Sequence, residues 1–497
     1  MILRSVQRAL TPGSSVAERA VTGGVWVVLL NVVDRLIRFG ALIVLARFLS
    51  PAAFGLLGLG LLVLAVVRQS TKLGLNAALV HHEDDDVDHY LDTTWVLTVT
   101  RGLLIALAAF VSAPYVASLF DAPQLTDVVR VVALTPLLKG LRNPGVVYFK
   151  KELLFHKQFG YQISGTVAYA VATVGVALVS PTVWALVAGT LAGAAVRTTS
   201  SYAIHPYRPR FRFDLSAARR LLGYGKWIFG SGLVLLALNW GDDGMIGWYV
   251  GAASLGLYRL AFQFSNAPAT EVTQVISSVA FPAYSQIQDD TAALREAFLR
   301  TMRVVSFVSF PVAVGIAAVA PVFVDAFFGP EWLPMVDVIR VLAVWGAFRS
   351  IAAGIGPLFR ATGRPQYNTA LQSLRLVVFA AAVYPATAAW GIVGTAIAIV
   401  VSALVENPIA IYVSIRAVDT SVRRVGRLLA IPASASLAMG VVVVSVQTVG
   451  TGLGEYAELA VLVATGVVVY GTLVFCWSRL TDLELESDLA TLQRALT

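Results

Sequence analysis

Long apolar runs separated by short polar segments fill almost the whole chain. The runs are continuous, unlike the alternating pattern of a membrane β-barrel, and reach the ~20 residues that a helix needs to cross a bilayer. The predicted spans are 21–47, 55–80, 92–118, 125–149, 159–180, 182–204, 222–250, 254–283, 297–327, 333–359, 366–388, 390–415, 426–448 and 456–478. Because helices satisfy their own backbone hydrogen bonds in lipid, we predict an all-α, polytopic integral membrane protein with about 14 transmembrane helices.

The predicted spans divide into two halves of six, with two spans left over. Two similar segments, "AAFGLLGLG" from Ala52 and "AASLGLYRLA" from Ala252, lie 200 residues apart and end the first hairpin of each half. Parallel repeats of this kind are common in transporters. The predicted parts are an N-terminal cytoplasmic segment 1–20, an N-lobe 21–204, a basic linker 205–221, a C-lobe 222–415, two further helices 416–478 and an amphipathic cytoplasmic tail 479–497.

Basic residues gather in alternate loops and orient the chain. Charged residues make up only 13% of the sequence, about half the share in soluble domains. The loops 150–157, 208–220 and 416–427 are rich in Lys and Arg, whereas the loops between them are short and nearly lack both. The positive-inside rule therefore places both termini on the cytoplasmic side of the cell membrane. The net charge of +8 is thus topological, and membrane lipids rather than nucleic acid are the expected surroundings.

Polar residues within the first span form a stripe. Asn31, Asp34, Arg35 and Arg38 follow the spacing i, i+3, i+4, i+7, which places them on one helical face. A charge at mid-bilayer costs ~2.5–3.5 kcal/mol on insertion scales, so such residues face a cavity or a partner. One interpretation is a cavity-lining stripe that attracts a phosphate, which we favour. The other is an internal Asp34–Arg38 pair that closes a helix contact.

Other spans also carry charges. The basic candidates for the cavity are Arg101, Lys139, Arg142, Arg349 and Arg375. The acidic candidates, which could couple transport to protons or sodium or could pair with these bases, are Asp242, Asp243, Glu271 and Glu406. Bases outnumber acids, and arginine binds phosphate oxygens with a planar fork. The surplus favours an anionic ligand, whereas an exporter of cationic drugs would need carboxylates.

The sequence offers no candidate for covalent chemistry. Cys476 is the sole cysteine, and the five histidines lie outside the apolar runs without metal-ligand spacing. We therefore predict no catalytic residues, no metal and no cofactor.

Several segments resemble one family in order and spacing. They are "LARFLSPAAFGLLGLGLLVLA" from Leu45, "LGLNAALVHHEDD" from Leu73, "LGLYRLAFQFSNAP" from Leu255, "VISSVAFPAYSQIQDD" from Val275 and "FGPEWLPMVDVIRVLA" from Phe328. These resemble the polysaccharide transporter (Wzx-like) family, within the superfamily of multidrug, oligosaccharidyl-lipid and polysaccharide exporters. The resemblance implies fourteen helices in two lobes around a central cavity.

The resemblance also implies a function. The expected protein is a flippase, not an enzyme, which moves a polyprenyl- or dolichyl-(di)phosphate-linked oligosaccharide from the cytoplasmic to the outer face by alternating access. The product would serve cell-surface polysaccharide or protein glycosylation, with glycosyltransferases or polymerases as candidate partners. The alternatives are a membrane-embedded glycan polymerase or glycosyltransferase, which lacks the long outer loop it would need here, a multidrug/cation antiporter of the same superfamily, and a peptidoglycan-precursor flippase.

Overall fold

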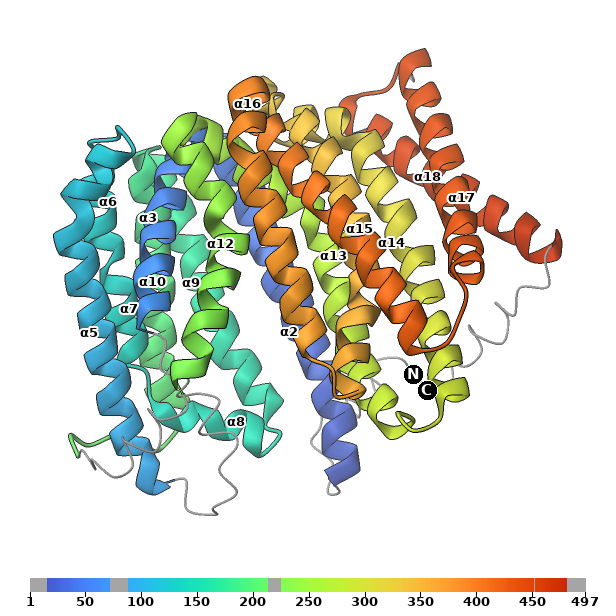
Figure 1. Cartoon of the computed structure of the whole chain (residues 1–497). Coiled ribbons are helices and arrows are strands. Elements are labelled where there is room, and N and C mark those ends of the chain that lie inside the picture. Colours follow the sequence, from blue (N-terminus) through green and yellow to red (C-terminus); the bar gives the residue numbers. More distant parts are fainter. Residues whose placement is uncertain (1–15, 72–87, 213–224, 451, 481–497) are drawn as a thin grey trace, which may run out of the picture. The chain divides into compact units, whose positions relative to one another are not determined.

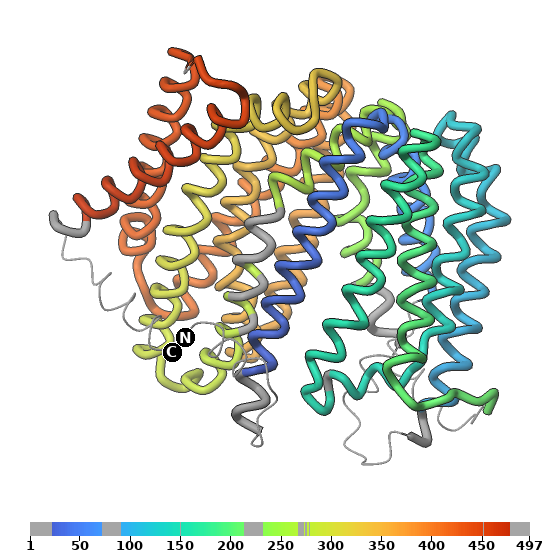
Figure 2. Tube along the Cα trace, turned by 180° about the vertical axis from the view of Figure 1, so that it is seen from behind, coloured from blue at the N-terminus to red at the C-terminus, as the bar shows by residue number. Residues whose placement is uncertain are grey.

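The computed structural model describes residues 16–71, 88–212, 225–450 and 452–480, and every element that it assigns within them is a helix. The chain forms two compact units, Met1–Gly256 and Leu257–Thr497. Within each unit, most of the long helices run roughly side by side (Figures 1 and 2). The predicted segment 1–20 and tail 479–497 lie almost entirely outside the described residues, as does 213–221 of the predicted linker.

The first unit holds the elements up to the start of α13. They are α2 (Val16–Ala46), α3 (Pro51–Ser70), α5 (Asp88–Leu119), α6 (Leu125–Val132), α7 (Leu134–Gly140), η1 (Pro144–Val147), α8 (Tyr148–Lys151), α9 (Phe155–Val179), α10 (Val183–Ile204) and α12 (Gly225–Tyr249). Helix α9 packs between α2 and α10, and α5 packs on α6 and α7.

Glycines set the tight contact of α9 with α10. A Cβ atom on Gly189 or on Gly193 would lie 2.8 Å from a backbone oxygen of α9. The four-residue spacing of these glycines places both on one face, where small residues let membrane helices approach closely. This close packing holds the polar side chains of α9 and α10 within reach of one another.

The predicted fourth span, 125–149, is not one helix. It consists of the short helices α6 and α7, followed by η1 and α8. Pro136 lies near the start of α7 and Pro144 begins η1, where Asn143 caps the new turn through the amide of Gly145. Proline lacks the N–H that would continue a helical ladder, so the prolines account for part of this segmentation.

The second unit holds the remainder of the chain. Helix α13 (Ala252–Gln286) begins in the first unit, and the elements that follow are α14 (Thr291–Phe327), η2 (Pro330–Trp332), α15 (Met335–Ala361), α16 (Gln366–Ala417), α17 (Val422–Val449) and α18 (Glu455–Leu480). Helix α14 packs on α15, α17 and α18, and α15 packs on α16. The core includes the buried side chains of Tyr284, Phe298 and Phe359.

Helix α16 contains two predicted spans, 366–388 and 390–415. Trp390 and Gly391 have non-helical backbone angles, with φ of +58° at Gly391, so that two helices meet at a sharp kink. Figure 1 shows the chain turning back at this end of α16. The positive φ needs glycine, since other residues are strained there.

Eight helices of the described chain are long and apolar enough to cross a membrane, with α16 counted once. The all-α, polytopic prediction is confirmed by these helices and by the fold that they form. The number of fourteen spans stays a prediction. The predicted seventh span, α12, packs on α3, so the division into units falls after Gly256 and not at the basic segment 205–221.

Candidate functional site

The polar stripe of α2 contains an ion pair. The Arg38 Nε atom lies 2.8 Å from Asp34 Oδ2, and the two side chains are 42% and 30% exposed. Asn31 and Arg35, from the same stripe, are exposed. The pair that the sequence offered as the second interpretation is therefore present, and it stays partly accessible rather than being sealed in a core.

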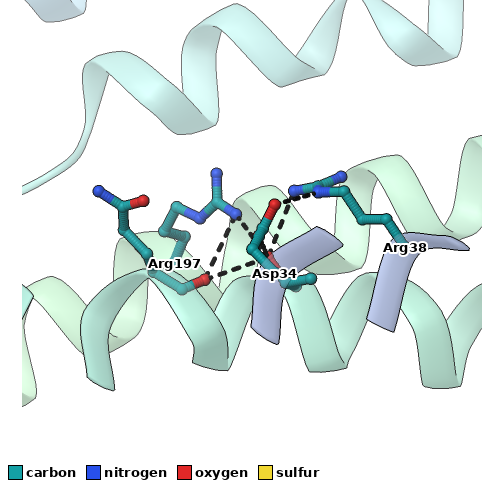
Figure 3. Close-up of polar contacts among 5 residues, drawn as sticks. Asp34, Arg38 and Arg197 are labelled. Carbon is teal, nitrogen blue, oxygen red and sulfur yellow. Dashed lines mark hydrogen bonds and ion pairs between the residues drawn. The ribbon is translucent and has the colours of Figure 1, made fainter. Parts of the chain in front are cut away.

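A threonine of α9 completes this pair. The Thr166 hydroxyl donates a hydrogen bond to Asp34 Oδ1 and accepts one from Arg38 Nη2 at 3.3 Å. It accepts a second from Arg197 Nη2, also at 3.3 Å. A hydroxyl has one hydrogen and two lone pairs, so this buried group uses its full capacity. Figure 3 shows Asp34 between the two arginines.

Arg197, on α10, is the main residue that the sequence analysis missed. Its Nη2 also lies 3.4 Å from the Gln162 carbonyl oxygen. A Cβ atom at Gly165 would lie 2.6 Å from Arg197 Nε, so the glycine makes room for the arginine. Arg197 lies inside the predicted span 182–204, and the rule that selected Arg101 would also have selected it. We define the α2–α9–α10 network as Asp34, Arg38, Thr166 and Arg197.

More cations surround the network. Lys139 interacts electrostatically with Arg38, Arg68, Arg142 and Arg197. Its own side chain is exposed, whereas Arg142 is half-buried and its buried Nε has no hydrogen-bond partner among the described residues. These five cations and the single carboxylate of Asp34 give this part of the first unit an excess of positive charge that suits an anion.

Arg101 has a different place. Its Nη2 donates to the Arg68 carbonyl oxygen at 3.1 Å and its Nε to the Thr71 hydroxyl at 3.3 Å. These acceptors lie at the C-terminal end of α3, where carbonyl groups lack helical partners and the helix dipole favours a cation. Arg101 thus contacts the neighbouring span, the second of the roles that the sequence allowed.

The second unit brings Arg349 and Arg375 together on one indole. Their guanidinium carbons lie 5.2 and 5.5 Å from the Trp345 ring centroid, within the range of cation–π contacts. Arg349 Nη1 also donates to Asn266 Oδ1 at 2.9 Å. Trp345 and Asn266 are buried. Glu406, half-buried, interacts electrostatically with Arg375.

The other acidic candidates do not join either group. Asp242 and Asp243 are buried on α12 in the first unit. Glu271 falls on α13, but its side chain lies outside the described residues. Among the side chains that the structure describes, no three of His, Cys, Asp or Glu gather closely enough to hold a metal ion.

Comparison with known proteins finds relatives over most of the chain. Residues 44–337 match the model of a family described as "Polysaccharide biosynthesis protein". Lipopolysaccharide biosynthesis protein WzxC of Escherichia coli (strain K12) is 26% identical over 81% of this chain and 82% of its own length. Succinoglycan biosynthesis transport protein ExoT of Rhizobium meliloti (strain 1021) is 26% identical over 67% of each chain.

A solved structure shares the fold. The lipid II flippase MurJ, in an inward closed conformation, superimposes with a TM-score of 0.72 and 12% sequence identity. The match covers 91% of this chain and 98% of MurJ. At this identity the similarity concerns the fold alone.

Proposed function

Because the chain belongs to the polysaccharide biosynthesis protein family, we propose that it flips a lipid-linked oligosaccharide from the cytoplasmic to the outer face of the cell membrane by alternating access. The lipid carrier would be a polyprenyl or dolichyl (di)phosphate. The name of ExoT describes a transport protein, and MurJ, whose fold this chain shares, is a flippase. Both support transport rather than synthesis.

The α2–α9–α10 network carries the proposal. Two guanidinium groups share one hydroxyl with a carboxylate, and further cations lie within electrostatic range. A phosphate offers several oxygens to the same N–H groups that now contact Thr166 and Asp34, and Arg binds such oxygens strongly. We infer that an incoming phosphate replaces Asp34 as the partner of Arg38, and that Asp34 takes the arginine back on release.

This exchange needs no covalent step and no cofactor. A carboxylate already paired with arginine returns to that pair when the anion leaves, so neither state leaves a buried charge without a partner. A multidrug or cation antiporter would need unpaired carboxylates, and the network contains one carboxylate beside several bases. The termini would lie in the cytoplasm, as the basic loops favour.

The test replaces the network arginines one at a time. Arg38→Ala and Arg197→Ala should each lower the delivery of lipid-linked glycan to the outer leaflet by about tenfold or more, since each removes a charge-assisted hydrogen-bond donor. Arg35→Ala tests whether the stripe extends along α2. Delivery is measured in cells as glycan accessible to a membrane-impermeant glycosidase.

The control is Arg340→Ala. Arg340 is exposed and pairs with Asp337, three residues earlier on α15, so it removes the same group outside the network. Wild-type delivery by both Arg38→Ala and Arg197→Ala, at equal membrane levels, would remove the network from the proposed path. Equal loss in Arg340→Ala would assign the effect to general charge.

A further inference from the structure

Residues 205–212, with the sequence HPYRPRFR, follow the end of α10 and adopt neither helix nor strand. We name this segment the α10 strap. Side chains of other elements bind its backbone. Asn143 Nδ2 donates to the Tyr207 carbonyl oxygen at 2.6 Å, and Asp92 Oδ1 accepts from the Arg210 backbone N–H at 2.8 Å. The strap is therefore held at two points rather than left as a loose loop.

Asn143 is itself rigidly placed. Its side chain is fully buried, its backbone N–H donates to Ser201 Oγ at 3.0 Å, and its Oδ1 accepts from the Gly145 N–H at 2.9 Å. A buried amide with all these partners satisfied specifies one arrangement of the chain around it. It ties the strap to η1 and to the last turn of α10.

Aromatic side chains add to this anchoring. The Tyr207 hydroxyl donates to Asp92 Oδ1 at 2.5 Å, and the His205 ring stacks on Tyr148 with an interplanar angle of 10°. The edge of the Phe211 ring meets Trp95, with the centroids 4.8 Å apart. Asp92 and Trp95 belong to the start of α5, so the strap joins three elements at one end of the first unit.

The strap presents charge and an apolar ring to the outside. Arg208, Arg210 and Arg212 are exposed at alternate positions, and no carboxylate of the described chain pairs with them. Phe211 lies between two of them and is 81% exposed. Lys151 and Lys157, on the nearby α8 and α9, are exposed as well. Arginine flanking an exposed aromatic ring is the pattern of a surface that rests in the membrane interface.

We propose that the α10 strap binds anionic phospholipid headgroups in the leaflet at that end of α10. The three arginines contact lipid phosphates while Phe211 reaches toward the acyl boundary. Each basic residue near an anionic membrane surface contributes favourably to binding. Because folding already orders the backbone, lipid binding avoids much of the entropic penalty that a loose polybasic loop would pay. An acidic protein would match the arginines but leave Phe211 without a purpose.

The experiment measures lipid binding by the purified full-length chain. Native mass spectrometry in detergent compares dioleoylphosphatidylglycerol with dioleoylphosphatidylcholine, in the absence of any glycan. Wild type should bind phosphatidylglycerol about tenfold more tightly than phosphatidylcholine, and Arg208→Gln/Arg210→Gln/Arg212→Gln should lose most of that preference. The triple lysine variant should keep most of it, because lysine preserves the charge.

Two further variants separate the strap from charge in general. Arg364→Gln/Arg423→Gln/Arg427→Gln removes three exposed arginines of the second unit and should leave the strap's preference intact. Tyr207→Phe keeps all charges but removes the hydrogen bond to Asp92, and should weaken the preference about twofold to threefold. Thermal unfolding in detergent checks that each variant is folded.

Three results would overturn the assignment. One is an unchanged preference in the glutamine variant, and another is equal loss in the control triple variant. The third is displacement of bound phosphatidylglycerol by a poly-glutamate peptide at equal concentration, which would indicate an acidic protein partner instead. None of these measurements involves transport, so the outcome is independent of the proposed flippase activity.

Discussion

Each unit brings two arginines together on its helices, but different groups hold them. In the first unit, Arg38 and Arg197 meet at the Thr166 hydroxyl, beside Asp34. In the second, Arg349 and Arg375 both lie over Trp345. A carboxylate and a hydroxyl occupy the N–H groups that an anion would use, whereas a ring contacts the face of a guanidinium. The first arrangement is suited to exchange of partners, and the second to fixed placement.

The largest expected effect tests the fixed placement. Trp345→Ala removes a side chain that is only 4% exposed and the ring beneath both arginines. Loss of a buried Trp costs about 3–5 kcal/mol, and two cation–π contacts disappear with it. We expect a clear drop in the midpoint of thermal unfolding of the detergent-purified protein.

Two matched substitutions accompany it. Trp345→Phe keeps an aromatic face and should lose about half as much stability. Trp390→Ala removes a Trp that is 61% exposed and should change the free energy of unfolding by about 0.5 kcal/mol or less. If Trp345→Ala were no less stable than Trp390→Ala, the indole would not be the support of the arginine pair.

The second effect tests the shared hydroxyl. Thr166→Val keeps the shape of a fully buried side chain but leaves two guanidinium N–H groups without this acceptor and Asp34 without this donor. An unsatisfied buried polar group costs about 1–3 kcal/mol, and the lower value applies here because Arg38 and Asp34 are partly exposed and can reach water. We expect a loss of about 1–2 kcal/mol in the free energy of unfolding.

Thr173→Val serves as the control on the same helix. Thr173 is equally buried, and its hydroxyl donates to the Tyr169 carbonyl oxygen of its own helix. It takes no part in the network, so the smaller loss expected there measures a threonine hydroxyl alone. Thr166→Ser should behave as wild type. A loss in Thr166→Val no greater than in Thr173→Val would show that the arginines do not depend on the shared hydroxyl.

Local spacing made half of the first site predictable. Asp34 and Arg38 lie four residues apart on one helix, so their pairing follows from helical geometry. Thr166 and Arg197 lie on α9 and α10, and only tertiary packing brings them to Asp34. Arg197 could have been chosen as a charge within an apolar run, but its partner could not. The same holds for Arg349 and Arg375, whose common indole depends on the packing of α15 against α16.

The fold shows the same limit. Apolar run length predicted the helices, and the boundary at Trp390 was predicted where the chain turns. The broken fourth span was not predicted, although Pro136 and Pro144 lie within it, because proline is tolerated in membrane helices when neighbours satisfy the backbone. The division after Gly256 depends on α12 packing against α3, which no local pattern encodes.

The smallest expected effect tests the exchange of partners at Arg38. Asp34→Asn retains the shape of the side chain but removes its charge. The Asp34–Arg38 pair is 30% and 42% exposed, so solvent screens it, and its loss should cost only about 0.5–1 kcal/mol of stability. If Asp34 competes with phosphate for Arg38, the same change should tighten binding of inorganic pyrophosphate to the purified protein by about threefold.

These opposite signs make the variant informative. Isothermal titration calorimetry measures the affinity for pyrophosphate, and thermal unfolding measures stability on the same sample. Asp337→Asn, which breaks the exposed pair with Arg340, should change neither the affinity nor its salt dependence. Weaker pyrophosphate binding in Asp34→Asn would mean that the carboxylate positions Arg38 and Arg197 for the anion instead of competing with it. The first unit would then resemble the second, with arginines held in place by a permanent support.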